Sequence, residues 1–306
     1  MQGLTATRLP TLRTATDRTY RSQSVNRAAH SSLNSVRQSA PGGAPRLVTQ
    51  SPGFEGGRRH FLSAGMFASM LARPSSSAAY SSKIDEVLVD PGYPEKWPFR
   101  PDDFKRYDES SDFQFYDSPR FVTHIDDNAI KALTKYYAKV FPQAGNPDVA
   151  ILDICSSWIS HYPKGYSAGK ISGLGMNEEE LARNPVLTDY AVKDLNEDPK
   201  LPYDDNTFDF VTNAVSVDYL TRPKEVFEEM VRVLKPGGTA IMSFSNRCFP
   251  TKAISIWTQT GDPDHVWIVG AYYHYTDGFS KPQGIDISPN PGRSDPMYVV
   301  TASKNA

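Results

Sequence analysis

The strongest constraint on the fold is an alternation of short apolar segments with segments of helical periodicity in the second half of the chain. The apolar segments are residues 149–154, 170–174, 190–194, 207–213, 239–245 and 298–302. Apolar residues recur at helical spacing in residues 126–141, 177–182 and 222–234. Strands separated by helices are typical of β-α-β units, so this order predicts a doubly wound, mostly parallel α/β sheet.

In such a sheet, ligands bind beyond the carboxyl ends of the strands, where the strand order reverses. The residues that follow the apolar segments are therefore the candidates for chemistry. Polar and aromatic side chains are concentrated at residues 156–162 and 245–248, which follow the first and the fifth of the main apolar segments. This concentration favours a functional cleft over a purely structural sheet.

Two motifs in this region point to a family. Residues 201–211 read LPYDDNTFDFV, and residues 228–238 read EEMVRVLKPGG. At this spacing they resemble class I S-adenosylmethionine-dependent methyltransferases, in the branch of quinone and small-molecule methyltransferases. The resemblance covers about residues 149–245. It implies a seven-stranded, Rossmann-like, mostly parallel sheet with an antiparallel final strand, for which residues 298–302 are the candidate.

The resemblance also implies S-adenosylmethionine as cofactor and a small-molecule methyl acceptor. It places Asp194 against the adenine amine, with Leu195 as an apolar wall for the ring. Asn213 ends the fourth strand, where the family has groups near the reacting methyl. Asp153 opens the segment that corresponds to the family's first glycine loop.

This first loop departs from the family pattern Asp/Glu-x-Gly-x-Gly-x-Gly. Cys155, Ser157 and Ile159 stand at the three glycine positions, and Gly175 stands where the family has an acid that binds the ribose hydroxyls. Glycines at such positions let the backbone approach a ligand without a Cβ clash. Two interpretations are open, a rebuilt cofactor site and a vestigial pocket in a protein that binds another ligand or a protein.

In the rebuilt site, side chains replace the lost backbone contacts. Ser156, Ser157 and Asn177 would supply hydrogen bonds, and Trp158 would stack on the cofactor or cover it. In the vestigial case the chain is a catalytically silent binding or assembly factor.

Further candidates for the reaction lie elsewhere in the chain. A histidine titrates near neutral pH and can remove a proton from a hydroxyl acceptor. The histidines proposed as such a base are His161, His265 and His274. The residues proposed to bind the substrate are Arg247, Tyr272 and Tyr273, with Arg247 as a partner for a carboxylate. For each histidine the alternative is a hydrogen-bonded structural residue.

The first part of the chain has a different composition. Residues 1–82 contain ten Arg, no Lys and two acidic residues. This Arg-rich, Ser-rich, acid-poor composition is typical of organelle transit peptides. The Arg58-Arg59 pair, the weakly apolar run at 61–72 and the small residues at 77–79 resemble a twin-arginine export signal. We expect a removable leader at 1–79 and a chloroplast protein, in the stroma or the thylakoid lumen, with the mitochondrion or a basic nucleic-acid-binding tail as alternatives.

The rest of the chain divides into an extension and a domain. Residues 80–121 are rich in Pro and aromatic residues and are expected to wrap over the methyltransferase-like domain at 122–306, either covering its cleft or only following its surface. Residues 83–306 carry 23 basic and 33 acidic side chains, a balance that disfavours nucleic acid as a partner.

Composition limits the remaining classes. Two Cys exclude a disulfide framework and a four-Cys zinc cluster, so no metal is expected. No apolar run is long enough to span a membrane, which leaves only peripheral thylakoid association. The sequence leaves the acceptor and the oligomeric state open.

Overall fold

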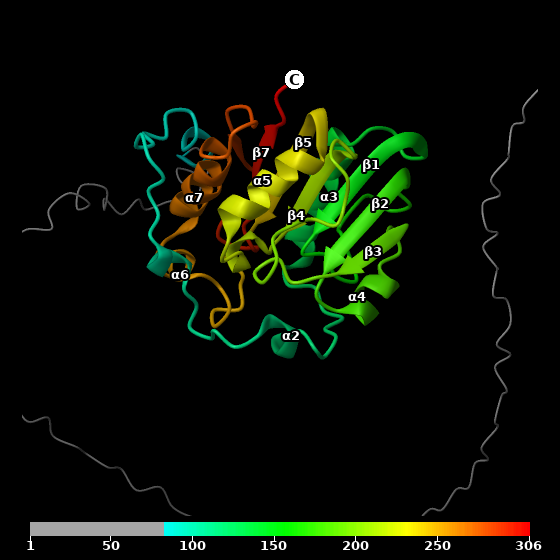
Figure 1. Cartoon of the computed structure of the whole chain (residues 1–306), viewed down its shortest axis with the longest axis horizontal. Coiled ribbons are helices and arrows are strands. Elements are labelled where there is room, and N and C mark those ends of the chain that lie inside the picture. Colours follow the sequence, from blue (N-terminus) through cyan, green and yellow to red (C-terminus); the bar gives the residue numbers. More distant parts are fainter. Residues whose placement is uncertain (1–82) are drawn as a thin grey trace, which may run out of the picture. The chain divides into compact units, whose positions relative to one another are not determined.

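The computed structural model describes residues 83–306, so the predicted leader at 1–79 lies outside the described residues. Seven strands form one sheet in the order β3-β2-β1-β4-β5-β7-β6 (Figure 1). The β2–β3, β1–β2, β1–β4 and β4–β5 pairs are parallel, whereas β7 runs antiparallel to β5 and β6. This topology confirms the predicted doubly wound, mostly parallel sheet with an antiparallel final strand.

The strands follow the predicted segments closely. They are β1 (Asn146–Ile154), β2 (Ala168–Gly175), β3 (Asp189–Val192), β4 (Phe208–Ala214), β5 (Leu234–Phe244), β6 (Gln283–Asp286) and β7 (Tyr298–Ser303). Strand β6 was not predicted, and β5 begins five residues earlier than expected. The Pro236-Gly237-Gly238 turn lies within β5, where the pairing with β4 is irregular and Gly237 has a φ of 79°.

The predicted helices are present, and the predicted N-cap of the first one is confirmed. Helix α3 (Asp127–Val140) begins after Asp126, whose carboxylate accepts the N–H groups of Asn128 and Ala129 at 2.9 Å. Helices α4 (Glu178–Arg183) and α5 (Pro223–Val233) also lie where the sequence predicted them. The shorter helical segments are α2 (Asp112–Phe115), α6 (Ser255–Gln259), η1 (Pro101–Phe104) and η2 (Val217–Tyr219).

Helix α7 (Asp262–His274) was not predicted. Its residues from His265 to Tyr273 are almost all buried, so apolar side chains surround the helix and show no amphipathic period. Residues 155–167, between β1 and β2, contain no helix, although a crossover between parallel strands usually carries one. The end of β1 is therefore followed by an irregular loop.

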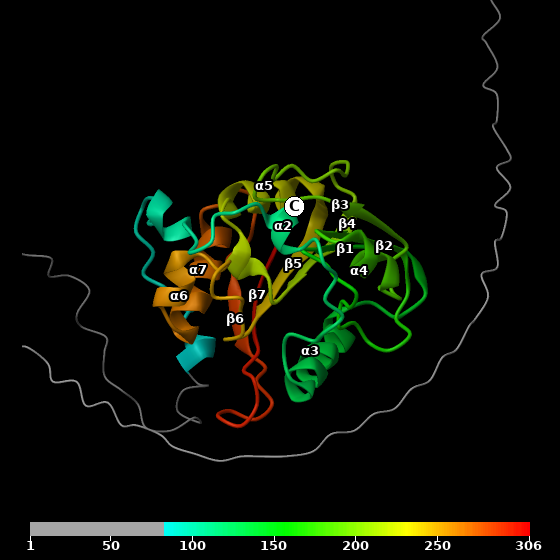
Figure 2. The same ribbon diagram turned by 90° about the horizontal axis from the view of Figure 1, so that it is seen from below.

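The sheet is covered on both faces, as Figure 2 shows. Helix α3 packs Leu133 and Tyr137 on one face, in the cluster that contains Ile151 of β1. Helices α5 and α7 cover the other face, where Met230 and Tyr272 belong to the cluster that contains Leu152. Neighbouring residues of β1 thus enter opposite clusters, as the strand period of two requires.

The extension before α3 does two things. Its first part packs aromatic rings on α7, with Phe99 5.6 Å from Tyr272 and Trp97 4.9 Å from Phe99 between ring centroids. Its second part carries α2 past the carboxyl ends of the strands (Figure 1). We call residues 112–124 the lid. No helix within residues 83–306 has the length and apolar character needed to cross a membrane.

Candidate functional site

A cavity lies at the carboxyl ends of β1, β2, β3 and β4, and it measures about 1160 Å³ with its open mouth included. The strand order reverses between β1 and β4, the place where doubly wound sheets bind ligands. The floor is formed by the residues that follow these strands. The lid and Phe249 form the other side, with the lid contributing Asp112, Tyr116, Arg120, Val122, Thr123 and His124. The extension therefore covers the cleft as well as following the surface.

Asp194 follows β3 and is a buried carboxylate of this cavity. Its side chain is 5% exposed, and Oδ1 accepts the N–H of Asn196 at 2.8 Å. Burial raises the pKa of the Asp194 carboxyl above its usual value. Leu195 lines the cavity beside it. The cavity thus has a carboxylate acceptor next to an apolar wall, where the sequence analysis placed an adenine ring.

Gly175 at the end of β2 has no room for a side chain. A Cβ there would lie 2.1 Å from the carbonyl oxygen of Ser156 and 3.2 Å from Leu181. The loop after β1 is held over this strand, because the N–H of Ser156 donates to the carbonyl of Leu174 at 2.8 Å. The acid that the family has at this position is therefore excluded by the path of the neighbouring backbone.

Asp153 organises the loop that replaces the glycine motif. Its buried carboxylate accepts the hydroxyls of Ser156 at 2.6 Å, Ser160 at 2.7 Å and Thr212 at 2.7 Å. Burial nevertheless raises the pKa of Asp153, because desolvation outweighs these hydrogen bonds. Asp153 and Ser156 both line the cavity, and their hydrogen bond fixes the start of the loop.

The other predicted cofactor residues hold the lid. Ser157 Oγ donates to Glu180 Oε2 at 2.5 Å, and Glu180 Oε1 accepts the backbone N–H of Arg120 at 2.6 Å. Trp158 Nε1 donates to the carbonyl of Val122 at 3.1 Å. Both predicted residues line the cavity, and Trp158 extends to the lid while leaving the cavity open.

Asn177 joins α4 to the lid. Its side-chain oxygen caps α4 by accepting the N–H of Glu180 at 3.1 Å. Its amide nitrogen donates to the carbonyls of Tyr116 and Asp117, at 2.9 and 3.0 Å. Asn177 also lines the cavity, so its polar atoms at this wall are already engaged with protein.

Backbone strain is concentrated at the same place. Among residues 83–306, four residues other than glycine have positive φ, and three of them line the cavity: Cys155 at 54°, His161 at 57° and Val215 at 47°. Such conformations cost about 1–3 kcal/mol each and gather at functional sites. Cys155 stands at the first glycine position of the family motif, so the chain keeps a glycine-like turn there without the glycine.

Only one of the three predicted histidines lines the cavity. His161 is 6% exposed, its Nδ1 has no partner among the described residues, and burial lowers its pKa to about 4, so the ring is neutral at pH 7. His265 stacks on Trp257 at 3.8 Å inside the α7 region, and its Nε2 lies 3.0 Å from the Trp257 carbonyl. His274 packs on Tyr93 at 4.7 Å.

The structure does not bring the other predicted residues to the cavity. Asn213 is buried behind it and donates to the carbonyl of Ile154 at 3.4 Å. Arg247 is 62% exposed at its side chain and lies 3.7 Å from Asp295. Tyr272 and Tyr273 were predicted to bind the substrate, but both side chains are buried in the core on α7.

Asp218 is a titratable group that the sequence analysis did not select. It lies in η2, between Ser216 and Tyr219, which line the cavity. Its carboxyl is buried, Oδ2 has no hydrogen-bond partner among the described residues, and burial raises its pKa to about 8. The carboxyl is therefore largely protonated at neutral pH, a state found more often at functional sites than elsewhere.

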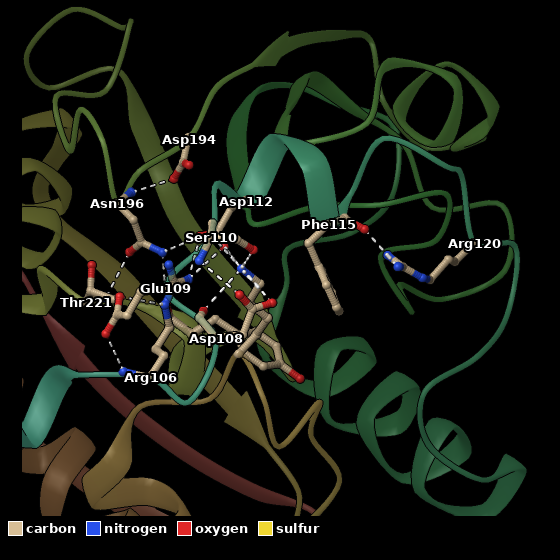
Figure 3. A network of polar contacts seen from close by, with 12 residues as sticks. Arg106, Asp108, Glu109, Ser110, Asp112, Phe115, Arg120, Asp194, Asn196 and Thr221 are labelled. Atoms are coloured by element: carbon tan, nitrogen blue, oxygen red, sulfur yellow. Dashed lines mark hydrogen bonds and ion pairs between the residues drawn. The ribbon is translucent and has the colours of Figure 1, made fainter.

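A buried network ties the lid to the cavity (Figure 3). Arg106 Nη1 donates to both oxygens of Asp112, at 2.8 and 2.6 Å. Lys252, only 1% exposed, places Nζ 3.2 Å from the same carboxylate. Asn196 donates to Asp112 at 2.9 Å and gives its backbone N–H to Asp194. The lid is thus bonded directly to the loop that carries Asp194.

Within residues 83–306, no group of three or more His, Cys, Asp or Glu side chains is placed to hold a metal ion.

Comparison with known proteins gives a partial match. A family model described as a methyltransferase domain matches residues 166–242, from the loop before β2 into β5. The chain is 48% identical over 46 residues to a ubiquinone/menaquinone biosynthesis C-methyltransferase UbiE of Ruegeria sp., covering 15% of this chain and 18% of that protein. It is 37% identical over 78 residues to a demethylmenaquinone methyltransferase of Bacillus mycoides, covering 24% and 33%. The chain thus spans a third or less of these relatives.

Among solved structures, an S-adenosylmethionine-dependent methyltransferase from Mesorhizobium loti is 18% identical, with a TM-score of 0.40. The alignment covers 56% of this chain and 98% of that one.

Proposed function

We propose that this protein transfers a methyl group from S-adenosylmethionine to a small molecule bound in the cavity. The observation that carries the proposal is Asp194, a buried carboxylate that faces the cavity beside Leu195 at the end of β3. The match to a methyltransferase domain over 166–242 supports it, because Asp194 lies inside that segment. The strand order that puts these residues at the reversal point supports it as well.

The residues present fit the cofactor, with one end changed. Asp194 and Leu195 suit an adenine amine and ring. At the other end, the cavity contains Arg120, whose Nη1 is buried without a partner among the described residues. A positively charged, unsatisfied donor suits the carboxylate of an amino-acid group.

The chain's own residues would align the reactants and exclude water. S-adenosylmethionine, when bound, supplies a methyl group on a positively charged sulfur. The lid and the loop after β1 enclose the cavity, which favours alignment of the acceptor in a site with little water. For a hydroxyl acceptor, His161 lines the cavity as a neutral ring and would take the proton that the oxygen loses as it bonds to the methyl.

An aromatic ring is the acceptor that the cavity walls suit best. Tyr116, Trp158, Tyr219 and Phe249 line the cavity, and rings of this kind pack against planar molecules. The two curated relatives are named for ubiquinone/menaquinone biosynthesis and for demethylmenaquinone. These names support a planar, quinone-like acceptor.

We place this activity in the chloroplast. The ten Arg, the absence of Lys and the two acidic residues of residues 1–82 support an imported protein. The Arg58-Arg59 pair supports onward export to the thylakoid lumen, and a mitochondrial address is the alternative. Protease protection of the tagged full chain in fractionated organelles distinguishes these compartments.

A second function is favoured by the changed end of the site. The crossover from β1 to β2 carries no helix, and Cys155, Ser157 and Ile159 replace the family's glycines. These changes are those expected of a catalytically silent binding or assembly factor. Binding of the cofactor product separates the two functions, because a silent pocket has no requirement to bind it.

Asp194→Ala tests the carrying observation. We expect the affinity of the full chain for S-adenosylhomocysteine to fall at least tenfold, because a hydrogen bond to a charged group is worth about 1.5–3 kcal/mol. Isothermal titration calorimetry measures the change. Asp205→Ala is the matched control, since the Asp205 carboxylate is 68% exposed and pairs with Arg232, and neither residue lines the cavity. Equal affinities in the two variants would show that Asp194 does not bind the cofactor.

A further inference from the structure

We propose that Arg120 binds a carboxylate group of the ligand in the cavity, and that this bond couples ligand binding to the lid. The inference rests on the proposed function only in taking this cavity as the ligand site. It assigns a binding residue and an anionic ligand group that the family motifs do not supply, because Arg120 lies outside the matched residues 166–242.

The guanidinium of Arg120 is fixed in place but only partly satisfied. Nη2 donates to the carbonyl of Phe115 at 2.8 Å, whereas Nη1 is buried and has no partner among the described residues. No carboxylate of residues 83–306 lies within 4 Å of the guanidinium, and Glu180 instead accepts the backbone N–H of Arg120. Leaving a buried charged donor unpaired is costly, so such a group is expected to have a ligand partner.

The other cations around the cavity are already paired. Arg106 and Lys252 share the carboxylate of Asp112, at 2.6 and 3.2 Å. Lys193 lines the cavity but pairs with Asp198 at 2.6 Å. Arg106 Nε is also buried without a hydrogen-bond partner, but its guanidinium is paired with Asp112. Among residues 83–306, Arg120 is therefore the cation that has a free, buried N–H and no carboxylate partner.

The histidines do not provide an alternative positive charge. Burial lowers the pKa of His161 to about 4, and burial also lowers the pKa of His124 at the mouth of the cavity. Both rings are therefore mainly neutral at pH 7. A ligand anion in this cavity would find its positive partner in Arg120.

Aromatic rings orient the guanidinium. Its carbon lies 4.4 Å from the ring centre of Phe115, 5.6 Å from Phe249 and 5.8 Å from Tyr116. Figure 3 shows Arg120 bonded to Phe115 at the end of α2. The flat fork of an arginine held this way suits the two oxygens of a carboxylate.

Two ligands present this chemistry, the amino-acid end of the cofactor and an acceptor that carries a carboxylate. The first is favoured by the loop after β1, which lacks the family's glycines and is not followed by a helix N-terminus that could bind an anion. Arg120 on the lid thus supplies the positive charge for the carboxylate, which the loop after β1 does not supply.

Three probes distinguish these sources in the full chain by isothermal titration calorimetry. S-adenosylhomocysteine carries the amino-acid carboxylate, methylthioadenosine has the same nucleoside and thioether without it, and benzoate carries a carboxylate on an aromatic ring. The variants are Arg120→Gln, Arg120→Lys and the control Arg100→Gln, which removes the same charge from a side chain that is exposed outside the cavity.

We expect Arg120→Gln to lower the affinity for S-adenosylhomocysteine at least tenfold and to leave the affinity for methylthioadenosine unchanged. The affinity of Arg120→Lys for S-adenosylhomocysteine is expected to lie between those of the wild type and Arg120→Gln. Unchanged thermal stability of the unliganded variant separates this role from a structural one. A loss of benzoate binding alone would assign the carboxylate to the acceptor. If Arg120→Gln changes none of the three affinities, the inference is overturned.

Failure of the proposed function gives a different result. If wild-type protein binds neither nucleoside but binds benzoate only with Arg120 present, the cofactor assignment fails and the anion site stands. Amide hydrogen exchange of the lid gives an independent reading. We expect the ligand to slow exchange at residues 112–124 in the wild type and not in Arg120→Gln.

Discussion

Gly175→Ala is expected to destabilise the protein by about 3 kcal/mol or more, although it adds a single methyl group. The added Cβ would lie 2.1 Å from the carbonyl oxygen of Ser156. That carbonyl cannot rotate away cheaply, because the N–H of the same residue is bonded to Leu174 in the neighbouring strand. The loop after β1 would have to leave the end of β2, and its bonds to Asp153 would be lost with it.

Urea unfolding of the full chain measures this change in free energy. Gly261→Ala is the matched control, because Gly261 has no heavy atom within 4 Å of its Cβ position and an ordinary φ of −125°. Gly261 is a helix N-cap, and its replacement by Ala is expected to lower the free energy of unfolding by less than about 1 kcal/mol. A Gly175→Ala protein as stable as the control would show that the loop after β1 does not lie over β2, and the account of the missing acid would be wrong.

Asp112→Ala is expected to lower the free energy of unfolding by about 3 kcal/mol, because it removes the most buried carboxylate partner of two buried cations. The carboxylates that remain are farther away and more exposed, because Glu109 lies 3.8 Å from Arg106 and Asp108 lies 3.3 Å from Lys252, which is itself only 1% exposed. Asn196 loses its bond to the lid as well, so the loop of Asp194 loses a support. Affinity for S-adenosylhomocysteine is expected to fall together with stability.

The control removes a surface carboxylate. Asp205→Ala breaks an ion pair between Arg232 and a carboxylate that is 68% exposed, and such pairs are worth at most about 1 kcal/mol. The double variant Asp112→Ala, Lys252→Met measures the coupling between Asp112 and Lys252 when it is compared with the two single variants. If Asp112→Ala unfolds at the same urea concentration as the control, the lid is not held by this network.

The sheet could be predicted because its signals are local. The strands β1, β2, β4 and β7 are short apolar runs, and α5 combines a proline at its start with an apolar stripe that ends in Val233. Helix α7 could not be predicted by the same means. It is buried over most of its length, so no polar face marks its period.

The site could be predicted only where it follows the strands. Asp194 and Leu195 were selected because the resemblance places an acid at the end of the third strand, and both line the cavity. Arg120 and Glu180 were missed because they meet across 60 residues of sequence, with no spacing rule to join them. His265 and Tyr272 were selected for their chemistry, but their side chains are buried on α7.

The proposed function requires a rebuilt nucleoside site between Asp194 and the lid. A crystal structure of the full chain grown with S-adenosylhomocysteine tests it most directly. We predict the adenine ring against Leu195 with its amine at Asp194, and the lid still bonded through Asp112. Binding of S-adenosylhomocysteine at another place, or a cavity that stays without it at saturating concentration, would contradict the claim.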